Sequence, residues 1–223
     1  MRDRLPFPVI AAGYPRAMEE SELEGVANFL YEVGLLKRSK RTGWWIAGIN
    51  DPESIAEHSF RTAVIGYILA LLEGADPGKT VILCVFHDTQ ETRTGDIPSV
   101  GKGYVSTASH TAVTADQVID FPGSIGAALR ALVAEYEARE SLEARCARDA
   151  DKLECLIQAR EYEAQGHANV APWITTSAEA LRTTSGQHLA KVCQEVPPTQ
   201  WWTPFAEAMN RRAHQSSHHR SEG

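Results

Sequence analysis

Residues 76–98 read DPGKTVILCVFHDTQETRTGDIP, and this stretch decides the fold. Asp76-Pro77 is a typical helix start, because aspartate caps free backbone amides and proline suits the first helical position. The following segment is apolar nearly all round, so we expect a central, buried helix carrying Val81, Ile82, Leu83, Val85 and Phe86. It ends in His87-Asp88. A carboxylate there must be paired, hydrogen-bonded or metal-bound, because burying an uncompensated charge is costly.

Apolar residues at three- and four-residue spacing predict helices on both sides of this stretch. A helix at residues 22–37 is expected to bury one face, formed by Leu23, Val26, Ala27, Leu30 and Val33. Another begins at the capping box Ser54-Ile-Ala-Glu57 and continues to Gly74 through Val64, Ile65, Ile68, Leu69 and Leu72. Residues 41–52 break the period and are predicted to form a long loop, and residues 94–98 a turn. Further helices are predicted at 107–120, 126–139, 142–165, 178–192 and 201–214. No convincing strand alternation occurs, so the sequence predicts an all-α domain.

The length of 223 residues is typical of one domain, expected at residues 21–214. Residues 1–20 are expected to form an irregular extension and residues 215–223, with their histidines, a disordered tail. Against 22 Lys and Arg stand 29 Asp and Glu, so the net charge is 22 − 29 = −7. This balance disfavours binding to polymeric nucleic acid, which depends on neutralising phosphates.

The four cysteines form no CxxC pair and are expected to be buried free thiols. No secretory signal or apolar span of ~20 residues is evident. We therefore expect a cytoplasmic protein without a membrane partner. Trp173 and Trp201-Trp202 are expected in the core or at a dimer interface.

Metal-binding side chains occupy three of the predicted helical regions: His58, His87 with Asp88, and Asp151. Two imidazoles and two carboxylates would leave room for water in a six-coordinate shell. Such a shell suits Mn²⁺, Co²⁺, Fe²⁺ or Mg²⁺ better than structural zinc.

The sequence as a whole resembles the HD-domain superfamily of metal-dependent phosphohydrolases, and more narrowly the HD-domain 5′-deoxynucleotidases. The matching stretches are LKRSKRTGW at 36–44, PESIAEHS at 52–59, HDTQETRTGDIP at 87–98 and DADKLE at 149–154, all within residues 22–165. The resemblance implies an HD-domain helical bundle, a divalent metal ion and a homodimer. It also implies hydrolysis of deoxynucleoside 5′-monophosphates to deoxynucleoside and phosphate by a metal-bound water.

The resemblance further implies a role for each matching position. Four residues would ligate the ion: His58, His87, Asp88 and Asp151. Glu91 and Asp96 would handle the attacking water and protons, and Glu91 stands one helical turn beyond Asp88, where it could orient that water. Arg41 would contact the phosphate. Trp44 would form a flat wall near the sugar that disfavours a 2′-hydroxyl. Lys152 and Glu154 are expected to support the ligands or lie on the surface.

Two other interpretations stay open. The chain could be an HD phosphohydrolase acting on a nucleoside triphosphate, a cyclic nucleotide or a nucleotide derivative. It could also be a catalytically silent HD module that binds a nucleotide and signals through a partner. Loss of a ligand or of Glu91 would favour the silent module, and all of these residues are present.

Overall fold

The computed structural model describes residues 20–209, and every regular element in that range is a helix, which confirms the all-α class. In chain order the elements are α1 (Glu20–Val33), η1 (Gly34–Lys37), α2 (Gly43–Ile46), α3 (Ile55–Glu73), α4 (Pro77–Phe86), α5 (Glu91–Thr94), α6 (His110–Gln117), α7 (Gly123–Ala138), α8 (Leu142–Ala164), η2 (Ala168–Val170), α9 (Ala171–Ala180) and α10 (Thr184–Glu195). Residues 203–209 are also helical. The expectations for residues 1–19 and 210–223, which include the tail histidines, lie outside the described residues.

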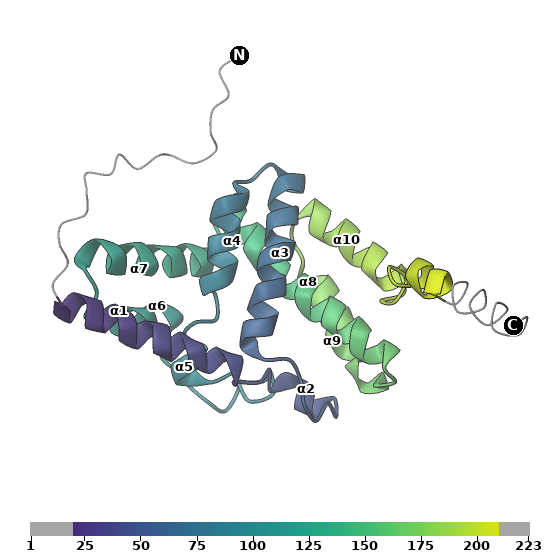
Figure 1. The fold of residues 1–223 in the computed structure, drawn as a ribbon, viewed down its shortest axis with the longest axis horizontal. Coiled ribbons are helices and arrows are strands. Elements are labelled where there is room, and N and C mark those ends of the chain that lie inside the picture. The colour runs from purple at the N-terminus through teal and green to yellow at the C-terminus, as the bar shows by residue number, and fades with distance from the viewer. Residues whose placement is uncertain (1–19, 210–223) are drawn as a thin grey trace, which may run out of the picture.

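Helices α3, α4 and α8 form the centre of the molecule (Figure 1). Helices α1, α5, α6 and α7 lie to one side of them, and α9 and α10 to the other. The 23-residue α8 contacts α3, α4, α7, α9 and α10. It contributes buried residues along most of its length, among them Ala144, Ala147, Leu153, Leu156 and Ala159. The functional side chains of α8 are therefore anchored in the core.

The two helices that precede the His-Asp pair have the predicted ends. Ser54 Oγ accepts a hydrogen bond from the Glu57 amide (3.2 Å), and Glu57 Oε2 accepts one from the Ser54 amide (2.6 Å). The capping box is thus confirmed, and α3 stops at Gly74, whose φ of 77° favours glycine. Asp76 accepts from the Lys79 amide (3.0 Å) at the start of α4. A short connection therefore fixes α4 against α3.

Helices α3 and α4 approach closely at Gly66. A Cβ atom built on this glycine would lie 2.5 Å from Cys84 Sγ and 3.4 Å from Thr80 Cγ2. The absence of a side chain thus sets the spacing between the two helices that carry His58 and His87. Cys84, Cys146, Cys155 and Cys193 are all free thiols, as expected, although Cys193 is only partly buried.

The predicted burial of α1 is wrong. Leu23 and Leu30 are 50% and 63% exposed, and the buried residue is Phe29, whose ring packs edge-on against Phe121 with centroids 5.4 Å apart. The helix also ends at Val33, and residues 34–37 form a 3₁₀ turn. A glycine at position 34, a poor helix former, coincides with this change.

The expectation that α4 is buried on all sides is also wrong. Leu83 and Cys84 are buried, but Ile82 and Val85 are 44% and 45% exposed. With the exposed side of α3 they form an apolar surface that we name the α3–α4 stripe: Phe60, Val64, Tyr67, Ile68, Leu71, Leu72, Ile82 and Val85. Within residues 20–209, α3 alone is long and apolar enough to cross a membrane by length and composition. It nevertheless packs against α4 and α8.

The predicted helix at 178–192 is two helices, α9 and α10, separated at Leu181–Thr183. The buried Asp149 carboxylate of α8 fixes this break. It accepts hydrogen bonds from the Arg182 amide (3.0 Å), the Thr183 amide (2.6 Å) and Thr183 Oγ1 (2.7 Å).

The predicted loop at 41–52 contains the single-turn α2, and α5 begins before the predicted turn at 94–98. The helices predicted at 107–120, 126–139 and 142–165 correspond to α6, α7 and α8, with ends shifted by up to three residues.

Candidate active site

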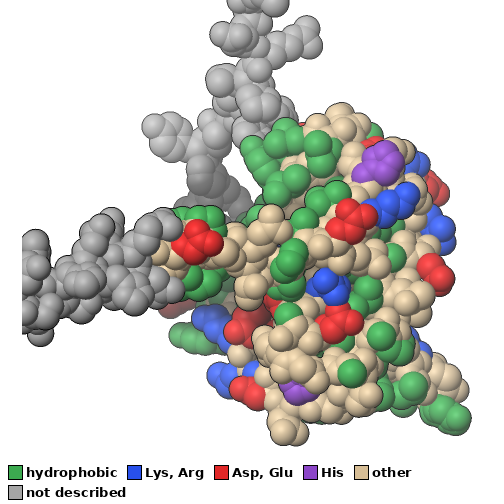
Figure 2. Space-filling view, turned by 90° about the vertical axis from the view of Figure 1, so that its right-hand side faces the viewer, with side chains coloured by type: hydrophobic (Ala, Val, Ile, Leu, Met, Phe, Trp, Pro, Cys, Tyr) green, Lys and Arg blue, Asp and Glu red, His purple; other side chains and the backbone are tan. Residues whose placement is uncertain are grey.

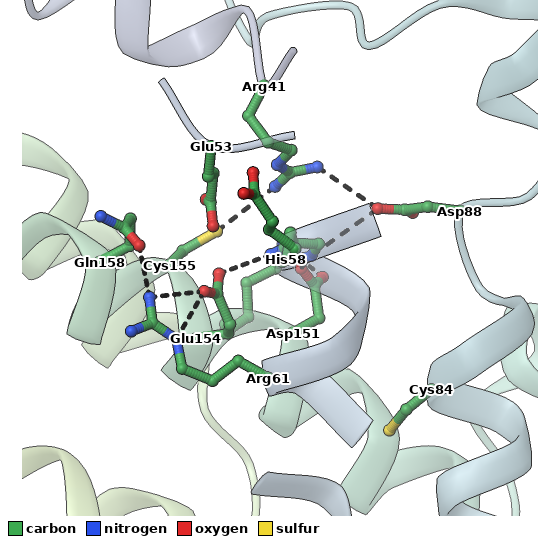
Figure 3. Close-up of polar contacts among 12 residues, drawn as sticks. Arg41, Glu53, His58, Arg61, Cys84, Asp88, Asp151, Glu154, Cys155 and Gln158 are labelled. Atoms are coloured by element: carbon green, nitrogen blue, oxygen red, sulfur yellow. Dashed lines mark hydrogen bonds and ion pairs between the residues drawn. The ribbon is translucent and has the colours of Figure 1, made fainter. Parts of the chain in front are cut away.

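The four predicted ligands come from three parts of the fold and meet at one point. His58 lies on α3, His87 and Asp88 follow the end of α4, and Asp151 lies on α8. His58 Nε2 is 3.3 Å from His87 Nε2, 3.3 Å from Asp151 Oδ1 and 3.7 Å from Asp88 Oδ2. His87 Nε2 is 3.0 Å from Asp88 Oδ2. Figure 3 shows Asp88 and Asp151 approaching His58 from different elements.

The other ring nitrogen of each histidine already has a partner. His58 Nδ1 lies 2.5 Å from Glu154 Oε2, and His87 Nδ1 lies 2.6 Å from the Cys84 carbonyl oxygen. Such contacts orient an imidazole and leave its Nε2 facing a metal ion. His58, His87 and Asp88 form a buried group that could hold a metal ion, and Asp151 adds a second buried carboxylate in contact with His58. Two imidazole nitrogens and two carboxylates fit a divalent cation.

Asp88 and Asp151 remain suited to a cation despite their burial. Burial alone would raise the pKa of Asp88, but His87 and Arg41 outweigh it and hold that pKa below its ordinary range. Burial also opposes ionisation of Asp151, whereas Lys152 and His58 lower its pKa. The Lys152 Nζ atom is 2.9 Å from Asp151 Oδ2. Both pKa shifts favour the charged form of these carboxylates.

A second cluster of possible ligands, His58, Glu154 and Cys155, lies on the opposite side of the His58 ring. Its groups are partnered by cations. Arg61 donates to Glu154 Oε1 from Nε (2.9 Å) and from Nη2 (2.8 Å). Arg41 Nη2 donates to Cys155 Sγ (3.4 Å). The ion therefore fits better on the Nε2 side of His58, and Glu154 orients that ring from behind (Figure 3).

Glu91 lies beside this centre with an unused oxygen. Its Oε2 atom is buried and has no hydrogen-bond partner among the described residues. Burial, and then repulsion from Asp88, raises the pKa of Glu91 to about 9. An unpaired buried carboxyl oxygen is costly, so a ligand or cation that engages it is expected.

Arg41 and Asp96 are connected across the opening of the site. Arg41 Nη1 is 3.4 Å from Asp88 Oδ2 and 3.5 Å from Asp96 Oδ1. Asp96 Oδ2 also accepts hydrogen bonds from the Thr42 amide (2.5 Å) and from Thr42 Oγ1 (2.9 Å). Asp96 thus fixes the backbone next to Arg41, a contact that the sequence did not indicate.

Trp44 is fixed from several sides. Its side chain is almost fully buried, and its Nε1 atom donates to Glu53 Oε1 (3.0 Å). Its ring packs edge-on against Tyr162, with centroids 5.2 Å apart, and lies 5.6 Å from the Trp173 ring. Burial, and then the nearby Glu154, raises the pKa of Glu53 to about 7. Sequence reasoning missed Glu53, although it stands inside the matching stretch 52–59.

A cavity of about 620 Å³ opens onto these groups, a volume typical of small-molecule sites. Six of the eight predicted site residues line it: Arg41, Trp44, Asp88, Glu91, Asp96 and Asp151. The remaining two, His58 and His87, are buried in contact with the lining carboxylates. The cavity wall also carries Lys152, which was expected to support the ligands or lie on the surface. It further carries three basic residues that sequence reasoning did not place there: Lys102, His110 and Arg148.

Two histidines and two aspartates gathered beside a cavity in a helical fold define a candidate divalent-metal site. The chain matches the HD domain family over residues 33–193 and belongs to that family. The 5′-deoxynucleotidase HDDC2 of Danio rerio is 32% identical over 145 residues, covering 63% of this chain and 71% of the relative. The 5′-deoxynucleotidase hdd1 of Schizosaccharomyces pombe is 31% identical over 153 residues, or 66% and 76% of the two chains.

The fold also matches a solved structure, described as a predicted metal-dependent phosphohydrolase from Magnetospirillum magnetotacticum MS-1. The TM-score is 0.59 at 26% identity, over 78% of this chain and 94% of the other. The overall helical architecture is therefore shared with this solved structure.

Proposed function

We propose that the chain is a metal-dependent phosphomonoesterase that hydrolyses deoxynucleoside 5′-monophosphates to deoxynucleoside and phosphate. The observation that carries this proposal is the meeting of two histidines and two aspartates at a cavity that also presents Arg41 and Glu91. The relatives named 5′-deoxynucleotidases support the choice of substrate.

The proposed metal ligands are His58, His87, Asp88 and Asp151. A divalent ion bound to them supplies positive charge for the phosphate and lowers the pKa of a coordinated water. A six-coordinate shell completed by water would suit Mn²⁺, Co²⁺, Fe²⁺ or Mg²⁺ better than a structural zinc ion.

Arg41 binds the phosphate group. Asp88 and Asp96 hold its guanidinium at 3.4 and 3.5 Å, so the side chain is positioned before the substrate arrives. Its permanent charge offsets negative charge on the transferred phosphoryl group. Asp96 serves this step mainly by fixing Arg41 and the Thr42 backbone, and it faces the same cavity as the reacting groups.

Glu91 orients the attacking water and accepts its proton. It lies three residues beyond Asp88 and keeps a buried oxygen without a protein partner. Positive charge nearby favours the ionised form of a carboxyl group, which is the form a general base requires. Trp44 provides the wall against the sugar, and its hydrogen bond to Glu53 fixes the ring.

One observation favours a second candidate, hydrolysis of a nucleotide with more phosphates. Lys102 and Arg148 add basic side chains to the cavity beyond Arg41. His110 and Lys152 line it too, although each already contacts a carboxylate, Glu137 and Asp151 respectively. A chain of phosphates would engage several of them at once.

Phosphate release from a panel of nucleotides tests both candidates. The metal-stripped protein is incubated with ribo- and deoxynucleoside monophosphates and triphosphates, with Mn²⁺, Co²⁺, Fe²⁺, Mg²⁺ or Zn²⁺ added singly. We expect orthophosphate from deoxynucleoside monophosphates with at least one of these ions. Release of pyrophosphate or triphosphate from triphosphates, with none from monophosphates, would favour the second candidate and overturn the first.

A homodimer is also part of the proposal, with the α3–α4 stripe as its interface. The stripe places eight apolar side chains on two adjacent helices, as in homodimer interfaces, whose centres are mainly apolar. Two copies that each carry a net charge of −7 repel one another, so association requires such an apolar contact.

Sedimentation measures the oligomeric state directly. The expected mass is twice 24.5 kDa, and Leu71→Lys should give monomers, whereas Leu30→Lys, at an exposed position on α1, should not. A monomeric mass for the unmodified chain would contradict the proposed dimer.

The proposed substrate is a small nucleotide rather than a polymer, and the proposed location is the cytoplasm. Acidic and basic side chains are interspersed on the face drawn in Figure 2, which offers no continuous basic track. Four free thiols are typical of a reducing compartment. Excess duplex DNA should therefore leave phosphate release from a deoxynucleotide unchanged, and strong competition would contradict this part of the proposal.

A further inference from the structure

Helix α9 turns one face toward the cavity. The lining residues from this helix are Trp173, Thr176, Ser177 and Ala180. Their spacing of three, one and three residues places them on a single helical face. Helix α9 packs against α8, which contributes the lining residues Asp151 and Cys155. One wall of the cavity is therefore built by a helix that carries none of the proposed catalytic or metal-binding groups.

Trp173 gives this wall a flat aromatic surface. Its ring centroid is 5.6 Å from that of Trp44, with 32° between the planes. Trp173 also packs against the hydrophobic core, and a Cβ atom built on Gly43 would lie 3.6 Å from Trp173 Nε1. Trp173 Nε1 has no hydrogen-bond partner among the described residues. Together the two tryptophans form an aromatic surface that extends from the Arg41 loop to α9.

Ser177 adds an unused polar group to the same face. Its side chain is 6% exposed, yet its hydroxyl has no hydrogen-bond partner in the part of the chain that the structure describes. The neighbouring Thr176 hydroxyl, by contrast, donates to the Pro172 carbonyl (2.8 Å). Ser177 lines the cavity, so its hydroxyl can donate to or accept from a ligand bound there.

We propose that this face of α9 binds the nucleoside, with the Trp173 ring packed on the nucleobase and Ser177 Oγ hydrogen-bonded to the nucleoside. This inference rests on the proposed function, because it assumes that the phosphate lies between Arg41 and the metal ligands. A nucleobase offers a planar face that stacks on aromatic side chains. Trp173 then serves substrate binding in addition to its packing against the core, which agrees with the expectation from the sequence.

The test compares substrates with and without a base. For Trp173→Ala we expect KM for a deoxynucleoside 5′-monophosphate to rise roughly 5- to 100-fold, in line with typical stacking effects. The KM for 2-deoxyribose 5-phosphate, which has the same sugar and phosphate but no base, should stay within about twofold of the unmodified value. Trp173→Phe should restore most of the affinity, because a phenyl ring also stacks. Ser177→Ala should raise KM for the nucleotide with little change in kcat.

Two control variants remove the same kinds of group, a tryptophan ring and a hydroxyl, at positions that do not line the cavity. Trp201→Ala removes a tryptophan that is 72% exposed and does not line the cavity. Thr175→Ala removes a hydroxyl from an exposed position of α9 that does not line the cavity. Neither should alter KM for either substrate. An equal rise of KM for both substrates in Trp173→Ala, or no rise for either, would overturn the inference.

A binding measurement separates this inference from the proposed function. Calorimetric titration of the protein with deoxyadenosine needs no turnover, and Trp173→Ala should weaken binding by a factor similar to its effect on KM. If the unmodified protein binds deoxyadenosine in a Trp173-dependent way but releases no phosphate, the proposed reaction is wrong and the proposed nucleoside binding by α9 is supported. If it hydrolyses deoxynucleotides and Trp173→Ala changes neither KM nor deoxyadenosine binding, the proposed nucleoside binding by α9 is wrong and the proposed reaction is supported.

Discussion

His58 joins the candidate metal centre to a chain of charged groups inside the protein. Glu154 Oε2 contacts His58 Nδ1, and Arg61 donates hydrogen bonds to Glu154. Glu161 and Gln158 also accept hydrogen bonds from Arg61 (2.8 and 2.5 Å). Burial opposes protonation of His58, but Glu154 and Asp151 raise the pKa of its ring. A carboxylate behind a ligating imidazole raises its basicity and fixes its orientation.

Replacing Glu154 tests this arrangement. Glu154→Gln keeps the shape of the side chain but removes the charge that faces His58 Nδ1. We expect metal affinity, measured by calorimetric titration with Mn²⁺, to fall about 10- to 100-fold. Glu161→Gln is the matched control, because it alters another Arg61 partner without touching His58. Equal losses in the two variants would show that the effect passes through Arg61 rather than through the imidazole.

Variants of Asp88 and Glu91 should distinguish the loss of metal binding from the loss of catalytic turnover. Asp88→Ala removes a ligand, so metal content after dialysis and activity should both be lost. Glu91→Gln should retain the metal and lose about 100-fold or more in kcat, the usual range for a general base. Metal loss in both variants to the same extent would show that Glu91 is a ligand, and its assigned role would be wrong.

Among individual residues, the sequence predicted those of the candidate site that belong to a short motif. It missed those that approach the site only because distant segments pack together. His58, His87, Asp88 and Asp151 stand in short matching stretches, and the structure brings them together. Trp173 lies 129 positions after Trp44, and no local pattern predicts that their rings lie 5.6 Å apart. Side-chain contacts between distant segments depend on packing that periodicity does not describe.

Among the elements, α1 is joined to α5 and α6 by hydrogen bonds to Glu32. Its carboxylate accepts hydrogen bonds from Arg93 Nε (2.8 Å), Thr92 Oγ1 (2.8 Å) and Gln117 Nε2 (2.8 Å). Arg93 contributes most to lowering the pKa of Glu32 from its ordinary 4.5 to about 2. These contacts connect α1 with α5 and α6.

The pKa of Glu32 predicts a pH dependence of stability. Because the folded pKa lies below the unfolded value, the stabilisation is present above about pH 4.5 and is lost as pH falls toward 2. Glu32→Gln should therefore reduce the drop in melting temperature between pH 5 and pH 2.5, measured by circular dichroism. Glu24→Gln, at an exposed position of the same helix, should leave the drop unchanged. An unaltered drop in Glu32→Gln would contradict the assignment.

Helices with strong end signals were the ones predicted well. Ser54 and Glu57 begin α3, Gly74 ends it, and Asp76 begins α4 as expected. The break between α9 and α10 was missed, because it depends on the Asp149 carboxylate, which stands more than 30 positions earlier. The exposed stripe on α3 and α4 was missed as well, since an apolar pattern does not distinguish the protein core from a surface that another chain could cover.

For the whole molecule, the four proposed ligands connect α3, the end of α4 and α8. An ion bound to them should therefore stabilise the folded state as well as serve the reaction. At a free concentration 100 times the dissociation constant, the stabilisation is about 2.7 kcal/mol, which raises the melting temperature of a domain this size by about 5–10 °C. Thermal unfolding with Mn²⁺ and with excess EDTA measures this difference. Asp88→Ala should show none, and a shift of equal size in that variant would place the ion elsewhere.

The central position of α8 has a consequence for local opening of the native state. Residues buried along this helix tie its backbone amides to the interior, so their hydrogen exchange requires nearly complete unfolding. Helix α9 buries only Ile174 and Ser177 and can open at lower cost. Its amides should exchange faster than those of α8. The cavity wall at Trp173 should therefore exchange its amides faster than the wall at Asp151.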